Sequence, residues 1–280
     1  MTDWLLGIVL GVVQGVSEWL PVSSKTQIII VSSYLLPSLG ITQAYAFGLF
    51  LEIGTFFAAL LYFRREVWSV LRALVGRGDE DGRMLLKYLV VLTLITAVLG
   101  VVIYKTVLDT ISGLAVGVPM VALGCILIGD AVLITLARGR FVPRKQIEEL
   151  SFRDLIVVGL AQGLAALPGV SRSGATVSAM LLLGVKPEDS FRLSFLALIP
   201  ASVGAAATSV LLSHVQINSV VKTVTLPVLA VAILVTVFIG VVFIRILLNA
   251  ARSNKIALLT FALGALAILS GIASLLRGAG

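Results

Sequence analysis

The sequence has a single cysteine, Cys125, and charged residues make up only 12% of its 280 residues. One cysteine excludes an intramolecular disulfide framework and a metal site built from several thiolates. So little charge, together with 59% hydrophobic residues and a mean hydropathy of +1.12, excludes an ordinary water-soluble domain. We therefore expect an integral membrane protein.

Long apolar stretches alternate with short charged loops along the chain. A helix needs about 20 apolar residues to cross a hydrocarbon layer roughly 30 Å thick. Six stretches reach this length: about 44–63, 85–104, 111–137, 190–213, 223–248 and 256–276. Strands of membrane β-barrels alternate polar and apolar residues, whereas 223–248 is apolar all round. We expect an all-α polytopic membrane protein with six transmembrane helices in one integral membrane domain, residues 1–280.

Four shorter apolar arms, 4–20, 22–37, 155–167 and 174–185, form two pairs. Each pair is joined by a polar segment that contains proline: PVSSK at 21–25, here called the first elbow, and PGVSRS at 168–173, the second elbow. Proline and glycine end helices, and arms of about 12 residues are too short to span a bilayer. We therefore expect two re-entrant helical hairpins whose elbows meet at an internal site.

The two elbow regions resemble each other in sequence. A shift of 148 positions sets Gly11, Gln14, Gly15, Val22 and Ser23 on Gly159, Gln162, Gly163, Val170 and Ser171. This similarity predicts two repeat halves of five apolar segments each, about 1–140 and 150–280. Because five is odd, the halves enter the membrane with opposite orientation. Such inverted repeats are typical of transporter folds, in which the site lies where broken helices meet.

The distribution of basic residues sets the orientation of the chain. Of the 21 lysines and arginines, 14 lie in segments 64–87, 138–153 and 245–255, which this topology puts on one side. The positive-inside rule makes that side cytoplasmic and leaves both termini outside. Membrane orientation thus accounts for the net charge of +7, and we expect no nucleic-acid partner.

Few ionisable residues lie within the apolar runs, and each is a functional candidate because charge at membrane depth is costly. They are Glu18, Lys25, Glu52, Asp130 and Arg172. Glu18 follows Gln14 by four residues, so both side chains lie on one helix face. A structural alternative is that Glu18 pairs with Lys25 or Arg172 and holds the two hairpins together. For Asp130, structural and functional roles both remain open.

The second elbow has the composition of an anion site. In PGVSRSGAT, at 168–176, one guanidinium is flanked by three hydroxyls just before a predicted helix. A rigid fork of charged donors, additional hydroxyl donors and the positive end of a helix are the groups that hold phosphate. The alternative is a capped helix start in which Arg172 pairs with Glu18.

The segments GVVQGVSEWLPVSS at 11–24 and LPGVSRSGAT at 167–176 together resemble the undecaprenyl pyrophosphate phosphatases of the bacitracin-resistance type. The resemblance continues along most of the chain, including FGLFLEIGTFFAALLYFRR at 47–65. It implies hydrolysis of a polyprenyl diphosphate to the monophosphate, which recycles the lipid carrier of cell-envelope glycan synthesis. It also implies inverted repeats and two re-entrant hairpins.

The resemblance further implies roles for individual residues. Arg172 would clamp a phosphate, Ser24 would be the nucleophile or position a water, and Glu18 would be the base or the ligand of a divalent cation. Hard ions such as Mg²⁺ or Ca²⁺ suit diphosphates, so we expect one as cofactor. The residues that would bind substrate are Gln14, Ser23, Gln27, Ser171, Ser173 and Thr176.

The chain departs from the family pattern just after the paired serines. The family continues with a small residue, glycine and a catalytic histidine, where this chain has Lys25, Thr26 and Gln27. Glutamine cannot act as a base near neutral pH, and the single histidine, His214, lies in a predicted outer loop.

Two functions remain after this departure. Either Glu18 and a metal ion handle the proton and the protein is a phosphatase, or it is a transporter or flippase of polyprenyl phosphate or a similar amphiphilic anion. The expected partners are a polyprenyl diphosphate lipid and membrane lipids of the cell membrane. A homodimer is left open.

Overall fold

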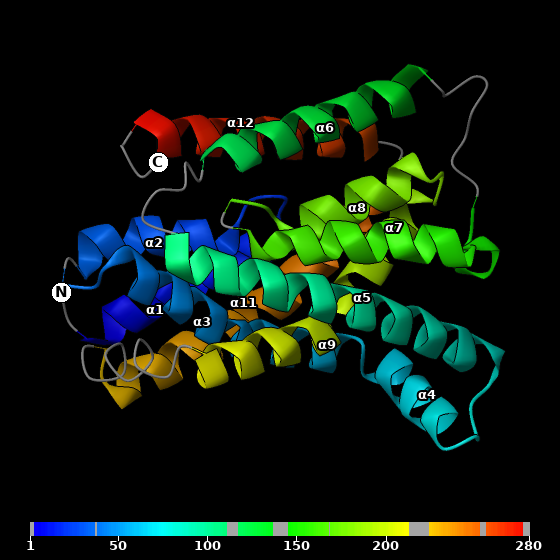
Figure 1. Cartoon of the computed structure of the whole chain (residues 1–280), viewed down its shortest axis with the longest axis horizontal. Coiled ribbons are helices and arrows are strands. Elements are labelled where there is room, and N and C mark those ends of the chain that lie inside the picture. The colour runs from blue at the N-terminus through cyan, green and yellow to red at the C-terminus, as the bar shows by residue number, and fades with distance from the viewer. Residues whose placement is uncertain are drawn as a thin grey trace.

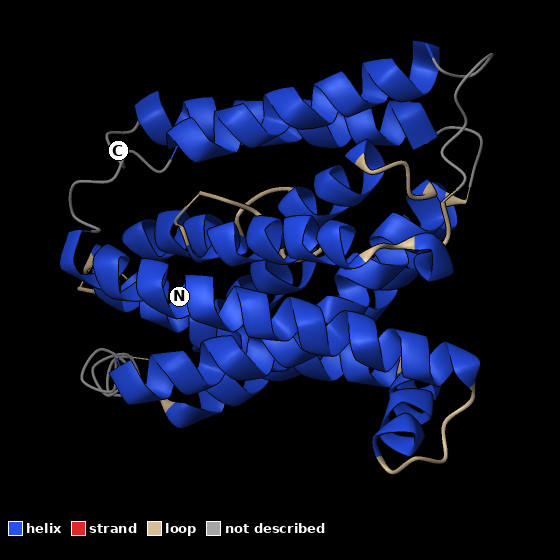
Figure 2. Cartoon of the chain, turned by 45° about the vertical axis from the view of Figure 1, so that its right-hand side comes forward, coloured by secondary structure: helices blue, strands red, loops and turns tan. Residues whose placement is uncertain are grey.

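The computed structural model describes residues 3–36, 38–110, 117–136, 145–167, 169–212, 224–252 and 256–276. These residues are almost entirely helical, and none of them forms a β-strand (Figure 2). The helices of the first half are α1 (Asp3–Ser17), α2 (Ser24–Leu35), α3 (Ile41–Tyr62), α4 (Arg64–Leu74), α5 (Glu80–Thr110) and α6 (Gly117–Leu136). Those of the second half are α7 (Phe152–Gly163), α8 (Arg172–Leu182), α9 (Pro187–Leu212), α11 (Leu226–Ala251) and α12 (Ile256–Leu276). Two short 3₁₀ turns are η3 (Ile147–Glu149) and η4 (Leu164–Ala166).

Five of the described helices, α3, α5, α9, α11 and α12, are long and apolar enough to cross a membrane. They coincide with five of the six predicted spans, which confirms an all-α, multi-pass membrane protein. The remaining predicted span, 111–137, contains the 20-residue helix α6, while residues 111–116 and 137 lie outside the described part. The single-domain assignment stays a prediction.

Helix α4 was not predicted, because it lies outside the long apolar stretches of the sequence. Its sequence, RREVWSVLRAL, alternates charged and large apolar side chains, and it projects from the bundle at one end (Figure 1). Trp68, Leu71 and Leu74 are exposed on it. An amphipathic helix of this kind suits the interface between lipid and water rather than the hydrocarbon layer.

Helices from the two halves pack in exchanged pairs. Helix α1 lies on α11 and α7 lies on α5, while α3 packs on α9 and α6 on α12 (Figure 1). Small residues allow the first pair to approach closely, because a Cβ added to Gly11 would come within 2.6 Å of the Ala232 carbonyl oxygen. Gly159 and Gly163 of α7 similarly face Ile95 and Leu99 of α5. These pairings are those that the predicted repeat would produce, although the repeat itself stays a prediction.

The two elbows are in contact inside the bundle, as the sequence predicted. The hydroxyls of Ser171 and Ser173 donate to the Leu20 carbonyl oxygen at 3.0 and 2.9 Å. The arms that carry the elbows are helices of 11 to 15 residues. At about 1.5 Å per residue such helices are shorter than the hydrocarbon layer, which agrees with arms that turn back inside it.

Candidate active site

Both elbows end in the start of a short helix. Ser23 is the N-cap of α2, where its side chain accepts from the Thr26 N–H, and Ser171 is the N-cap of α8, where its side chain accepts from the Gly174 N–H. These two serines are equivalent positions in the predicted repeat. Free N–H groups and the helix dipole make each start a favourable place for an anion. Ser23 and Ser171 therefore shape the site by fixing the two helix starts.

Glu18 is the centre of a buried hydrogen-bond network. Its Oε1 pairs with Nη2 of Arg172 at 2.5 Å. Its Oε2 accepts from the Ser24 hydroxyl at 2.6 Å and from the Gln14 amide at 3.0 Å. All four side chains are buried. The structure thus brings together the three predicted catalytic residues and Gln14, although 154 positions separate Glu18 from Arg172.

The Glu18–Arg172 pair also fits the structural alternative, in which an ion pair ties two hairpins together. The remaining donors of Arg172 argue against that as its whole role. Its Nε and Nη1 are buried and have no hydrogen-bond partner among the described residues. A buried charged N–H without an acceptor is costly, so these groups are suited to bind an anionic ligand.

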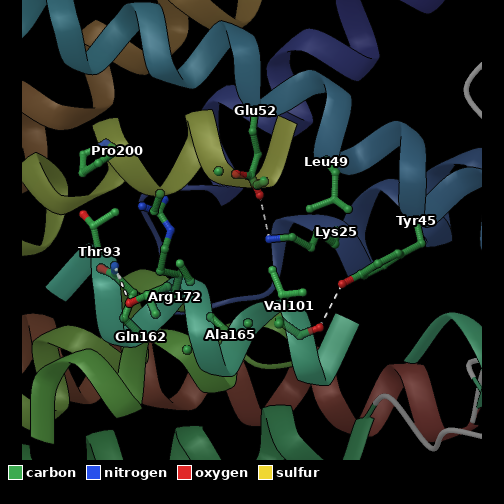
Figure 3. Close-up of a pocket in the computed structure, with 18 residues that line it drawn as sticks. Lys25, Tyr45, Leu49, Glu52, Thr93, Val101, Gln162, Ala165, Arg172 and Pro200 are labelled. Carbon is green, nitrogen blue, oxygen red and sulfur yellow. Dashed lines mark hydrogen bonds and ion pairs between the residues drawn. The ribbon is translucent and has the colours of Figure 1, made fainter. Parts of the chain in front are cut away.

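Arg172 lines a cavity of about 140 Å³ between α2, α3, α5, α7, α8 and α9. Figure 3 shows Arg172, Lys25 and Glu52 directed toward the same space. Lys25 pairs with Glu52, with 2.7 Å between Nζ and Oε1. Gln162 of α7 also lines the cavity and donates to Thr96 Oγ1 at 3.0 Å. The walls of the cavity are therefore apolar helices, but its lining includes two cations, Lys25 and Arg172, together with the Glu52 carboxylate and the Gln162 amide.

The other residues predicted to bind substrate contact the protein itself. The Ser171 and Ser173 hydroxyls donate to the backbone of Leu20, directly before the first elbow. Thr176 donates to the Arg172 carbonyl oxygen at 2.8 Å and contacts the Ser194 hydroxyl. These three side chains position Arg172. A direct contact of theirs with substrate stays a prediction.

Gln27 lies on the side of α2 away from the cavity. Its amide donates to the Ser270 hydroxyl of α12 at 2.7 Å, and it is not among the cavity-lining residues. Lys25 and Gln27 are two positions apart on a helix and hence about 200° apart around its axis. Because Lys25 faces the cavity, Gln27 faces the other way. The geometry therefore does not favour the predicted role of Gln27 in substrate binding.

Sequence reasoning assigned no role to several polar residues that line the cavity. Gln162 could have been found, since it is the repeat equivalent of Gln14. Thr93 and Thr96 are spaced to share one face of a long apolar span, which is a weaker signal. Asp130, the isolated acid of the predicted span 111–137, is buried on α6 and is not part of the cavity lining.

The described residues contain no group of three or more His, Cys, Asp and Glu side chains that could hold a metal ion. Glu18 and Glu52 supply carboxylate oxygens, which suit Mg²⁺ or Ca²⁺. Both oxygens of Glu18 already accept hydrogen bonds. A divalent cation would thus need phosphate oxygens of the substrate to complete its coordination.

These features define a class: a multi-span α-helical membrane protein with buried cationic side chains at an internal cavity, close to the starts of two short helices. A family model described as bacitracin resistance protein BacA matches residues 7–269. The chain belongs to this family.

Curated relatives agree with this assignment. The chain is 51% identical over 271 residues to an undecaprenyl-diphosphatase of Saccharolobus solfataricus, covering 96% of both proteins. It is 43% identical over 276 residues to one of Sulfurisphaera tokodaii, covering 96% of this chain and 97% of the relative. It is also 43% identical over 272 residues to one of Pyrobaculum aerophilum, covering 96% and 98%.

Proposed function

We propose that this protein is a membrane phosphatase that hydrolyses undecaprenyl diphosphate, or a closely related polyprenyl diphosphate, to the monophosphate. The family and the names of the relatives support this activity over transport. The structural observation that carries it is the arrangement of Arg172, which binds Glu18 with one nitrogen and keeps Nε and Nη1 for a ligand. Release of the monophosphate would return the lipid carrier to envelope synthesis.

Binding of the terminal phosphate falls to Arg172. Its planar guanidinium can donate two parallel hydrogen bonds to one phosphate, which fixes the orientation of the phosphorus atom. The start of α8 adds a positive dipole at the same place. Phosphoryl transfer depends mainly on such positioning and on stabilisation of charge in the transition state, so the cavity supplies the main requirements.

Proton transfer falls to Glu18 and Ser24. The 2.6 Å hydrogen bond between them gives the serine hydroxyl, or a water in its place, a carboxylate that can accept its proton. The oxygen would then attack the terminal phosphorus while the bond from phosphorus to the bridging oxygen breaks. The proton goes to Glu18 Oε2 and the prenyl monophosphate leaves. If Ser24 is the nucleophile, water hydrolyses the resulting phosphoserine in a second step.

A divalent cation remains part of this proposal. Glu18 would be its protein ligand, and Glu52 is the second carboxylate at the cavity. When bound, Mg²⁺ or Ca²⁺ would neutralise charge on the phosphates. A homodimer and the absence of nucleic-acid partners stay predictions.

The activity is tested by phosphate release from undecaprenyl diphosphate by the purified protein, with and without Mg²⁺ or Ca²⁺. We expect release of one phosphate per substrate and inhibition by a chelator. Binding of the lipid without any phosphate release, whichever metal is supplied, would exclude the phosphatase and leave transport as the function.

An apolar groove adjoins the polar cavity and is suited to the prenyl chain. It lies between α4, α5 and α9, has a volume of about 410 Å³, and includes Val70, Leu89 and Val203. Thr93 and Pro200 line both the groove and the cavity. A diphosphate at Arg172 could therefore extend its prenyl chain along the groove toward lipid.

Filling this groove should impair long substrates selectively. We expect Val203→Trp to raise KM for undecaprenyl diphosphate about tenfold. The indole ring would occupy part of the groove, and keeping two CH₂ groups of the prenyl chain out of it costs roughly 1.5 kcal/mol. Isopentenyl diphosphate, which is too short to reach the groove, should keep its KM. Val98→Trp is the matched control, since Val98 is exposed on α5 outside the groove. Equal effects of Val203→Trp on both substrates would exclude the groove as the chain site.

A further inference from the structure

The Lys25–Glu52 pair lies at the cavity but has no part in the proton transfer described above. Its two side chains are 10% and 3% exposed, and Nζ lies 2.7 Å from Oε1. Burying an ion pair among apolar helices is costly, and well-packed apolar residues would usually serve stability as well or better. A pair placed at the wall of an anion cavity therefore points to a ligand.

Lys25 and Arg172 lie at neighbouring but not equivalent places in the two halves, because the shift of 148 positions sets Ser24 on Arg172 and Lys25 on Ser173. Lys25 is the second residue of α2, two positions after the N-cap Ser23, and Arg172 is the first residue of α8, directly after the N-cap Ser171. Each half of the chain thus brings one helix start and one cation to the same cavity. Position 25 is also one at which this chain departs from the small residue of the family pattern.

The two cations still have donors for a ligand. Arg172 has Nε and Nη1 without a partner among the described residues. The ammonium of Lys25 has three N–H donors, and the ion pair that involves it is with Glu52. Because the Lys25 side chain is long and flexible, its ammonium can turn from Glu52 to a phosphate oxygen without movement of α2.

We propose that Lys25 and Arg172 form a two-cation clamp that selects a diphosphate over a monophosphate. Arg172, beside Glu18 and Ser24, binds the terminal phosphate, and Lys25 leaves Glu52 to bind the inner phosphate, which carries the prenyl chain. This inference rests on the proposed function and names the residue that recognises the second phosphate. It also explains why the product leaves: the monophosphate engages one cation where the diphosphate engages two.

Binding of two non-hydrolysable analogues tests the clamp without relying on turnover. The probes are a prenyl methylenediphosphonate and the prenyl monophosphonate of the same chain length, titrated by calorimetry into the full-length protein in detergent. The main variant is the double substitution Lys25→Met and Glu52→Gln, which removes the ammonium without leaving an unpaired buried carboxylate. The matched control is Lys145→Met with Asp154→Asn, an ion pair of 2.5 Å outside the cavity.

We expect the double variant to lose about tenfold or more in diphosphonate affinity, as for one hydrogen bond to a charged group. The monophosphonate, with one anionic group, can occupy Arg172, whose Nε and Nη1 have no partner among the described residues. Its affinity should therefore change by less than about threefold, and the control pair should leave both affinities unchanged. The clamp would be overturned if the double variant bound both analogues with wild-type affinity. It would also be overturned if both affinities fell by the same factor.

Phosphate release by the wild-type protein, measured alongside, separates this inference from the proposed function. A protein that prefers the diphosphonate through Lys25 but releases no phosphate would refute the phosphatase and support the clamp. If the protein hydrolyses undecaprenyl diphosphate but the double variant binds both analogues as the wild type does, the phosphatase is supported and the clamp is refuted.

Discussion

Replacing Glu18 with glutamine should lower the rate of phosphate release about 1,000-fold while the protein still binds substrate. The glutamine keeps the shape of the side chain but cannot accept the proton of Ser24, and loss of a general base typically costs about 100-fold to 10,000-fold. The rate should be measured on undecaprenyl diphosphate at saturating concentration, with the affinity for the methylenediphosphonate analogue determined in parallel.

The binding measurement separates catalysis from a purely structural role. If Glu18 only holds the two hairpins together, its loss leaves Arg172 misplaced, and analogue binding falls together with the rate. Glu188→Gln is a matched control, because its carboxylate forms an exposed ion pair with Arg252. Exposed pairs contribute little to stability, so this variant should resemble the wild type. Retention of more than a tenth of the rate by Glu18→Gln would show that another group takes the proton.

The second large effect is expected from Arg172→Lys. Lysine keeps the positive charge but cannot hold Glu18 with one nitrogen and donate two parallel hydrogen bonds to a phosphate with the others. Loss of two charge-assisted hydrogen bonds, each worth about 1.5–3 kcal/mol, predicts a fall in kcat/KM of about 100-fold or more. The thermal unfolding temperature should change less than in Arg172→Ala, because the buried Glu18 keeps a cationic partner.

Arg192→Lys provides the comparison for this variant. Arg192 pairs with Glu66 at 3.3 Å and is partly exposed, so the same chemical change there should leave kcat/KM nearly unaffected. A lysine at position 172 that supports hydrolysis at close to the original rate would show that a point charge is enough, and the bidentate contact would have to be abandoned.

Residues that lie close in the sequence account for most of what could be predicted. Apolar runs of sufficient length predicted the spans that α3, α5, α9, α11 and α12 occupy, because hydrophobicity over about 20 residues is a local property. The four-residue spacing of Gln14 and Glu18 predicted their contact for the same reason. The proline-bearing elbows and the motif around Arg172 predicted polar side chains at an internal site, and Arg172 does line an internal cavity; its role in binding an anion stays a prediction.

Pairings over long distances were decided by the tertiary structure. The sequence left open whether Glu18 pairs with Lys25 or Arg172, since both cations lie in serine-containing elbows. The packing of the two elbows brings Arg172 to Glu18, and the packing of α2 on α3 brings Lys25 to Glu52.

The direction of individual side chains was likewise set by packing. Gln27 lies in the same motif as Ser24 and Lys25, yet its amide donates a hydrogen bond to Ser270 of α12. The groove beside the cavity depends on how α9 lies against α4 and α5, two helices that are far from it in the chain. Hydrophobicity and helical periodicity therefore determined from sequence alone that this is a helical membrane protein with an elbow-borne anion motif. Only the packing of distant helices could decide which charges meet, because the energy of each ion pair depends on the position of both partners.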